Sequence, residues 1–369
     1  MIRELAGVAK RQYSNLRTFK AYSLGTLMKE LFLLPRDFLS ASGRSSNVLN
    51  VALFVTMRCN ARCAMCNLSE ILNKKDMADI PMDKIERFLD DVAGYHPSII
   101  LFGGEPFVRK DIVDIVKAVK KRGLSVGIFT NGTLLDKDTA ERLMLEKLDY
   151  IVFSLLGTKD VHDTILSMNG AYDKMVKGIK AFTDNRRRNT KVVTHTTICE
   201  GNLDDLKNIA SASASLGVDL VRFGHPTFYS TEERSRCNDA LKKIFEEGDV
   251  KAMSYIYDIR GKEDRYVEKI TKLRSELGNR VAFTPELSVD ELKSWYSPDF
   301  SSGRKCLFAL RGLFIYPNGD VYPCESISCR MGNVFDSGFS NVWNGERYKK
   351  FRRILKRGLL PACARCCKL

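Results

Sequence analysis

The feature that most constrains the fold is an alternation of strand-like and helix-like segments that begins near residue 50. Six short apolar runs have the length and composition of buried strands, and longer stretches between them have helical periodicity. The predicted strands are Val51–Val55, Ile99–Phe102, Ser125–Phe129, Tyr150–Phe153, Val192–Ile198 and Leu220–Phe223. Between them we expect helices such as Met82–Ala93 and Asp111–Arg122. Such alternation makes a parallel sheet with right-handed crossovers, so an α/β protein is predicted.

Six strand–helix units are too few for a closed eight-stranded barrel, which typically takes ~250 residues. The predicted core is therefore an open, partial (β/α)6 barrel that resembles part of a TIM barrel. Ligands of such sheets bind at the carboxyl ends of the strands. Residues that directly follow a predicted strand are therefore the first candidates for a functional site.

We divide the chain into four parts. Residues 1–46 are a basic amphipathic segment and residues 47–229 are the barrel core. Residues 230–300 are charged and read as a helical connector, and residues 301–369 as a small α+β unit. In this last unit, a hairpin is expected around the turn Pro317-Asn318-Gly319-Asp320.

The N-terminal segment contains an amphipathic helix with basic flanks. Its apolar residues recur at helical spacing, and Pro35 is expected to end it. These apolar residues are Leu24, Leu27, Met28, Leu31 and Phe32. Such a helix either packs on the main domain or lies on an anionic membrane surface. Both interpretations stay open at this point.

The formal net charge of +14 allows nucleic acid, an anionic membrane or an acidic protein as partner. No nucleic-acid-binding signature accompanies the charge, so we expect no nucleic acid partner. The sequence shows neither an export signal nor an apolar run of the roughly 18–20 residues that span a bilayer. We therefore expect a cytoplasmic protein, with peripheral contact to the inner face of the membrane through residues 1–46.

Cysteine is abundant, with 11 residues, and disulfides are rare in the cytosol. Cys59, Cys63 and Cys66 follow the first predicted strand with CxxxCxxC spacing. Three thiolates on one loop can bind three irons of a cubane cluster and leave the fourth iron open to another ligand. Zinc is the rival, but a structural zinc ion takes four ligands and no fourth Cys or His lies nearby.

The second predicted strand ends in Gly103-Gly104-Glu105-Pro106. Residues 50–225 therefore resemble the radical S-adenosylmethionine (SAM) superfamily in three features: the three cysteines, this Gly-Gly-Glu-Pro motif, and the order of the six strand–helix units. The resemblance implies a 4Fe–4S cluster whose open iron binds SAM. It also implies that Gly103 and Gly104 approach SAM closely and that Glu105 binds its ammonium group. Met65 stands where family members usually carry an aromatic residue near adenine, a mild departure.

The same resemblance suggests SAM contacts at two further strand ends. Asn131 follows the third strand and Ser154 the fourth, although both are also common turn residues. Thr196–Asn202 resembles the family's fifth-strand region near adenine. The implied reaction is reductive cleavage of SAM to a 5′-deoxyadenosyl radical, which removes hydrogen from a substrate C–H bond.

A second group of cysteines lies beyond residue 300: Cys306, Cys324, Cys329, Cys363, Cys366 and Cys367. Around the predicted hairpin this region resembles the SPASM/twitch appendage of radical SAM enzymes. The resemblance implies one auxiliary 4Fe–4S cluster bound by Cys306, Cys324, Cys363 and Cys366, with Cys329 and Cys367 as alternates. Zinc would suit four thiolates equally well. A fully ligated cluster suggests an electron relay.

The reaction's partners are predicted only by class. An acidic flavodoxin or ferredoxin is the expected electron donor, because the protein is basic. A small molecule, a lipid and a peptide all remain candidate substrates. His225 and Tyr229 follow the sixth strand and are expected to face the active-site mouth. The catalytic residues are otherwise unknown, and the rival class is a non-catalytic iron–sulfur or zinc-binding regulatory protein.

Overall fold

A computed structural model describes residues 24–74, 78–185, 189–245, 259, 261–297, 300 and 302–368. One ten-stranded sheet runs through them in the order β10-β9-β8-β1-β2-β3-β4-β5-β6-β7. Its six central strands are parallel and consecutive, as the sequence predicts. They are β1 (Asn50–Thr56), β2 (Ser98–Gly103), β3 (Ser125–Thr130), β4 (Tyr150–Phe153), β5 (Lys191–Thr197) and β6 (Leu220–Gly224).

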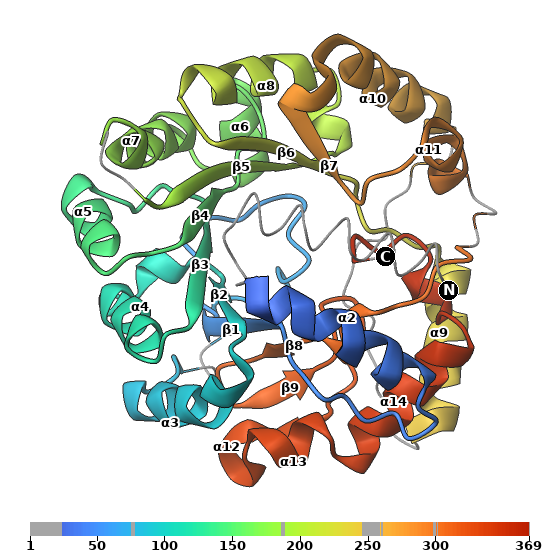
Figure 1. Cartoon of the computed structure of the whole chain (residues 1–369). Helices are drawn as coiled ribbons and strands as arrows, with labels where there is room; N and C mark the ends of the chain where they lie inside the picture. Colours follow the sequence, from blue (N-terminus) through green and yellow to red (C-terminus); the bar gives the residue numbers. More distant parts are fainter. Residues whose placement is uncertain are drawn as a thin grey trace.

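Helices surround the curved sheet on its outer side, so that the strands enclose an interior (Figure 1). These helices are α3 (Met82–Val92), α4 (Ile112–Lys121), α5 (Lys137–Leu145), α6 (Lys159–Leu166), α7 (Ala171–Thr183) and α8 (Leu206–Ser215). Alternate residues of a strand face opposite sides of a sheet. In β1, Val51, Leu53 and Val55 join the core that contains the helices, whereas Ala52 and Phe54 join a separate cluster inside the barrel. The fold is the predicted partial barrel.

Two strands extend this barrel beyond the six that were predicted. β7 (Val281–Thr284) pairs parallel with β6, and β8 (Gly312–Ile315) pairs parallel with β1. β7 lies within the region expected to be helical throughout, because four residues between charged helices carry too little pattern to indicate a strand. The helices of that region are α9 (Thr231–Phe245), α10 (Glu263–Leu277) and α11 (Val289–Tyr296).

The C-terminal region contains the expected hairpin, but β8 is also part of the barrel sheet. β8 pairs antiparallel with β9 (Asp320–Tyr322), and Gly319 takes a φ of +88° in the turn between them. β10 (Gly332–Asn333), α12 (Val334–Ser337), α13 (Phe339–Trp343) and α14 (Glu346–Arg357) follow. Our four-part division therefore stays a prediction, since one sheet runs across its boundaries.

Six short 3-10 helices complete the regular structure of the residues that the structure describes. They are η1 (Ala93–Tyr95), η2 (Pro106–Val108), η3 (Glu200–Asn202), η4 (Gly278–Arg280), η5 (Phe308–Leu310) and η6 (Pro361–Cys363). Among the helices of the described residues, none is long and apolar enough to cross a bilayer.

The amphipathic segment forms α2 (Leu24–Leu39), and the prediction that Pro35 ends it is wrong. The helix continues past the proline, and Ser40 N still donates to Arg36 O at 3.0 Å. Proline removes one backbone donor from a helix interior. Contacts made beyond the proline hold the last turn in place, above all those of Asp37.

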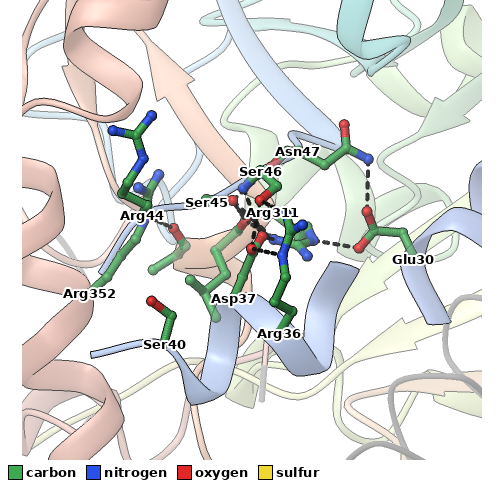
Figure 2. Close-up of polar contacts among 12 residues, drawn as sticks. Glu30, Arg36, Asp37, Ser40, Arg44, Ser45, Ser46, Asn47, Arg311 and Arg352 are labelled. Atoms are coloured by element: carbon green, nitrogen blue, oxygen red, sulfur yellow. Dashed lines mark hydrogen bonds and ion pairs between the residues drawn. The ribbon is translucent and has the colours of Figure 1, made fainter. Parts of the chain in front are cut away.

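The polar face of α2 points into the protein, as Figure 2 shows. Arg311 forms ion pairs with both Glu30 and Asp37, and the side chains of all three are at most 5% exposed. Asn47 Nδ2 also donates to Glu30 Oε1 at 2.7 Å. The opposite face leaves four apolar side chains in solvent: Met28, Leu31, Phe32 and Leu39 are 52%, 59%, 75% and 66% exposed. The helix is therefore fixed to the protein by buried ion pairs, together with the packing of Leu34 and Phe38 against Leu310.

Replacing Arg311 by Met should detach α2, because Glu30 and Asp37 would lose their buried cation, and the exposed Arg36, 3.6 Å from Asp37, replaces it poorly. Breaking a buried pair in this way costs about 3–5 kcal/mol. We expect a lower melting temperature and rapid proteolysis within α2. The variant E30Q/D37N/R311M, which leaves no unpaired charge, should lose much less stability. Wild-type stability in R311M would contradict the prediction.

Candidate functional site

The cysteine loop after β1 is bonded directly to the end of β2. Gly104 N donates to Thr56 O at 3.0 Å, and Glu105 N donates to Arg58 O at 2.9 Å. A Cβ on Gly103 would lie 2.5 Å from Thr56 O, and one on Gly104 would lie 2.3 Å from Arg58 O. Both glycines are therefore required for the approach of these two backbones, in addition to any ligand.

Glu105 lies buried behind this contact, with 1% of its surface exposed. Its carboxylate accepts hydrogen bonds from Thr130 Oγ1 (2.7 Å), Asn131 N (2.7 Å) and Phe107 N (3.1 Å). Burial nevertheless raises the pKa of Glu105 to about 7, against the lowering effect of these bonds. Each carboxylate oxygen has two lone pairs, so an ammonium group can still bind there. A cation at this position would stabilise the ionised carboxylate of Glu105 and so counteract the effect of burial on its pKa.

The three cysteines of the loop are half-buried. Burial raises the pKa of Cys59 to about 11 and of Cys63 to about 12, and it raises the pKa of Cys66 as well. Asn73 holds the first of them, because Asn73 Oδ1 accepts from Cys59 N at 2.9 Å and Asn73 Nδ2 donates to Cys59 O at 3.2 Å. The thiols would be protonated at neutral pH, so cluster binding has to release their protons.

As the side chains stand, no three Cys, His, Asp or Glu residues in the described part of the chain converge closely enough to hold a metal ion. The donors nevertheless fit a cubane cluster: three thiols on one loop and the glycine cradle beside them. The cysteine loop, Gly103, Gly104 and Glu105 therefore meet at one end of the barrel.

Two of the other predicted SAM contacts lie around this edge. Asn131 Nδ2 donates to Asn60 Oδ1 at 3.0 Å and so joins the end of β3 to the cysteine loop. Met65 packs in the apolar cluster that contains Leu156 and Ile165 beside the loop. The assignment of these residues to SAM stays a prediction.

The remaining strand-end candidates have contacts within the chain. Ser154 follows β4, and its backbone N donates to Thr130 O at 2.9 Å. Within the predicted adenine region, Thr196 donates to Leu155 O at 2.6 Å. Asn202 bonds the backbone of Cys199, Leu156 and Thr197. The side chains of Thr196 and Asn202 thus form hydrogen bonds with the protein's own backbone.

Sequence reasoning missed three polar residues that support the loop: Asn60, Asn73 and Thr130. Thr130 could have been noticed, because it is the polar last residue of an apolar strand. Asn60 lies between two of the cysteines but belongs to no motif that we used. Asn73 lies outside the CxxxCxxC segment, and only the fold brings it back to Cys59.

The auxiliary cysteines are brought together only in part. Cys306, Cys324 and Cys363 lie in one apolar cluster, and burial, followed by Cys324 and Cys306, raises the pKa of Cys363 well above its usual value. Cys366 instead lies beside Cys367, whose Sγ donates to Glu325 Oε1 at 3.5 Å. The four-cysteine ligand set stays a prediction.

Two further cysteines, the alternate Cys329 and Cys237, have other surroundings. Cys329 is buried, and its Sγ accepts from Arg347 Nη2 at 3.7 Å. Cys237, which the sequence indicates to be a buried apolar thiol or a spare, is indeed buried and lies on α9 close enough to Cys363 to raise its pKa. Neither is assigned to the auxiliary cluster.

The expectation that His225 and Tyr229 face the active-site mouth is wrong. Both are buried, with exposures of 3% and 1%. His225 Nδ1 shares a hydrogen bond of 2.9 Å with the hydroxyl of Tyr296, and its ring stacks on Phe283. Both belong to the packing between β6, β7 and the helices that follow them.

An open parallel barrel with a cysteine loop and a glycine–glutamate step at one end defines the class: an α/β metallocofactor enzyme with its site at the strand carboxyl ends. Residues 53–212 match the family described as the radical SAM superfamily, and residues 306–367 match an iron–sulfur cluster-binding domain, SPASM. The chain belongs to the radical SAM enzymes that carry a C-terminal SPASM domain. Its cofactors are SAM and 4Fe–4S clusters.

Known proteins related to the chain have diverse activities. The AdoMet-dependent heme synthase of Methanosarcina barkeri is 25% identical over 82% of this chain and 84% of its own length. The PqqA peptide cyclase of Bradyrhizobium diazoefficiens is 24% identical over 82% and 75%. The crystal structure of Streptococcus suis SuiB bound to the precursor peptide SuiA covers 89% of this chain and 71% of its own, with a TM-score of 0.62 at 19% identity. This structural likeness shows the fold alone.

Replacing Gly104 by Ala should disrupt the cysteine loop. The added Cβ would lie 2.3 Å from Arg58 O and 2.8 Å from Cys59 Cβ. After anaerobic reconstitution we expect G104A to contain about four irons fewer per chain than the wild type, because one cubane is lost. Gly94 is the matched control, since an added Cβ meets nothing within 4 Å there. Equal iron contents in wild type, G94A and G104A would refute the prediction.

Proposed function

We propose that this chain is a radical SAM oxidoreductase in which Cys59, Cys63 and Cys66 bind the SAM-cleaving 4Fe–4S cluster. The observation that carries the proposal is the pair of backbone bonds from Gly104 and Glu105 to the cysteine loop. They bring the thiols and the buried carboxylate to one end of the barrel. The match to the radical SAM family covers these residues.

When bound, the cofactors would supply a one-electron cleavage of the SAM sulfur–C5′ bond to methionine and a 5′-deoxyadenosyl radical, which can take a hydrogen atom from the substrate. The chain's own residues bind and orient. Glu105 would receive the SAM ammonium group, and Gly103 and Gly104 would allow the backbone to approach the methionine moiety. Asn131 and Ser154 would contact SAM from the ends of β3 and β4, and Met65 would cover adenine. The barrel walls exclude solvent.

Cys306, Cys324, Cys363 and Cys366 are proposed to bind an auxiliary 4Fe–4S cluster that relays an electron. The match of residues 306–367 to an iron–sulfur cluster-binding domain supports it, as does the proximity of Cys306, Cys324 and Cys363. An acidic flavodoxin or ferredoxin would deliver the reducing electron. The net charge of +14 favours encounter with such a donor.

The triple variant C59A/C63A/C66A tests both cluster assignments at once. We expect its iron content to fall from about eight to about four per chain, because one of two cubanes is lost. The reduced protein should keep an electron paramagnetic resonance signal and should no longer release 5′-deoxyadenosine from SAM. The variant C306A/C324A/C363A should retain SAM cleavage. A folded, iron-containing triple variant with no remaining cluster signal would defeat the auxiliary assignment.

The substrate is proposed at the level of class only. The related peptide cyclases, and the likeness to a structure with a bound precursor peptide, keep a peptide among the candidates. The heme synthases support a non-peptide small molecule. A lipid is the third candidate, because α2 presents an apolar face to solvent.

We further propose that α2 places the enzyme on an anionic membrane surface. Its exposed residues Met28, Leu31, Phe32 and Leu39 lie on one side of the helix, as the 3.6-residue period requires. Lys29 and Arg36 are exposed beside them. The ion pairs of Arg311 keep the polar face inward, so the apolar face can enter the lipid interface without unfolding of the helix.

The double variant L31E/F32E should lose binding to phosphatidylglycerol vesicles. Two carboxylates on the apolar face remove its burial in lipid and repel the anionic surface, so we expect affinity to fall at least ten-fold in a sedimentation assay. Leu145→Glu is the control, because Leu145 is 79% exposed but lies on α5. Equal vesicle binding by wild type and L31E/F32E would exclude this surface.

A further inference from the structure

One buried arginine joins the two ends of the cysteine loop. Arg109 lies four residues after Glu105, and its side chain is 5% exposed. Its Nη1 donates to Val55 O at 2.9 Å and to Ile80 O at 2.8 Å. Val55 lies near the end of β1, where the loop begins, and Ile80 lies just before α3, where the loop ends. Both ends are therefore bonded to a single nitrogen atom.

Val55 is an irregular position of the sheet. The pairing of β1 with β2 shifts by one residue there, so Val55 has no register partner on β2. Such a bulge bends the strand and leaves one residue outside the ladder. The carbonyl oxygen of Val55 accepts instead from Arg109 and, at 3.4 Å, from Ile80 N. Arg109 thus supports the backbone at the point where β1 turns into the cysteine loop.

Two other nitrogens of Arg109 bind Asp111. Nε donates to Oδ1 at 2.8 Å and Nη2 donates to Oδ2 at 2.6 Å, which makes a bidentate ion pair. The hydrogen bonds from Arg109 hold the pKa of Asp111 below its usual range. Because a buried charge is costly without a partner, the pair with Asp111 keeps the guanidinium in its place behind the loop.

Arg109 and Glu105 lie at opposite ends of η2. Phe107 N donates to the Glu105 carboxylate at 3.1 Å, and Arg109 N donates to Pro106 O at 3.0 Å. This short helix directs the Glu105 side chain toward Thr130 and the Arg109 side chain toward the end of β1. The segment after β2 therefore contacts the cysteine loop twice, through the backbone of Glu105 and through the side chain of Arg109.

We propose that Arg109 is a positioning residue for the SAM cluster: by joining both ends of the cysteine loop, it holds the three thiols close enough together to retain the cluster. Groups that orient metal ligands without touching the metal commonly change metal affinity by about 10–100-fold. The inference rests on the proposed function, in which Cys59, Cys63 and Cys66 bind this cluster. It deepens that function by naming a side chain outside the cysteine triple on which cluster retention depends.

The test compares R109M with R122M in anaerobically reconstituted holoenzyme. Arg122 is the matched control, because it forms a bidentate pair with Asp90 and bonds Ala118 O, but it lies at the end of α4 and does not bond the cysteine loop. After addition of an iron chelator, samples are reduced at successive times. The electron paramagnetic resonance signal that C59A/C63A/C66A lacks is then followed. We expect this signal to decay at least about ten-fold faster in R109M than in the wild type or R122M.

Two further measurements separate positioning from a general loss of stability. Thermal unfolding of the cluster-free proteins should be lowered to a similar extent by R109M and R122M, because each variant loses one bidentate pair. The signal of the auxiliary cluster should decay at the same rate in both. R109K can still donate to a carbonyl at the base of the loop, so it should lose the SAM cluster more slowly than R109M but faster than R122K.

Equal decay of the SAM-cluster signal in R109M and R122M would overturn the proposal. Equally accelerated decay of both cluster signals in R109M would overturn it as well, because that result indicates general destabilisation. Release of 5′-deoxyadenosine from SAM by the wild type is measured in parallel. Its absence, with the cluster signal retained, would defeat the radical SAM function and leave the role of Arg109 standing.

Discussion

Two hydrogen bonds between backbone groups hold the site together. They join Gly104 N to Thr56 O and Glu105 N to Arg58 O, where β1 and β2 end side by side. Only glycine permits this approach, because a Cβ at either residue 103 or 104 would overlap a carbonyl oxygen of the opposing backbone. Once the bonds are made, the cysteine loop has a fixed starting point and Glu105 is directed into the barrel toward Thr130 and Asn131.

Much of the sheet could be predicted because buried parallel strands are short, apolar and separated by long helices. All six predicted strands are found at their positions, with ends that differ by at most one residue. β7 was missed because four residues between charged helices carry little pattern. The place of β8 beside β1 could not be inferred either, since pairing between distant segments depends on the closure of the barrel and not on local sequence.

The site was predictable where a short motif indicates a specific chemical role. The cysteine triple indicates cluster binding, and Gly103-Gly104-Glu105 indicates close backbone approach beside a carboxylate. It was not predictable where the fold alone decides which way a residue faces. His195 lies within β5 and faces the barrel interior, where it pairs with Arg222. His225 directly follows β6 but is buried against Phe283. The orientation of α2 could not be predicted either, since an amphipathic pattern does not indicate which face of the helix packs on the protein. There the buried Arg311 binds two acidic residues of the inner face, while four apolar residues of the opposite face stay exposed.

The pairing of β8 with β1 affects how the chain is made. Of the described strands, β1 leaves the ribosome before the others, and β2 follows it. The other edge of β1 stays unpaired until Gly312–Ile315 has been synthesised, after all the other parallel strands of the sheet. An unpaired apolar edge is a template for association with other chains. This edge is therefore exposed to association until β8 is made, and the loop that follows β1 gains its packing against Tyr316 and Tyr322 only after the SPASM hairpin has joined the sheet.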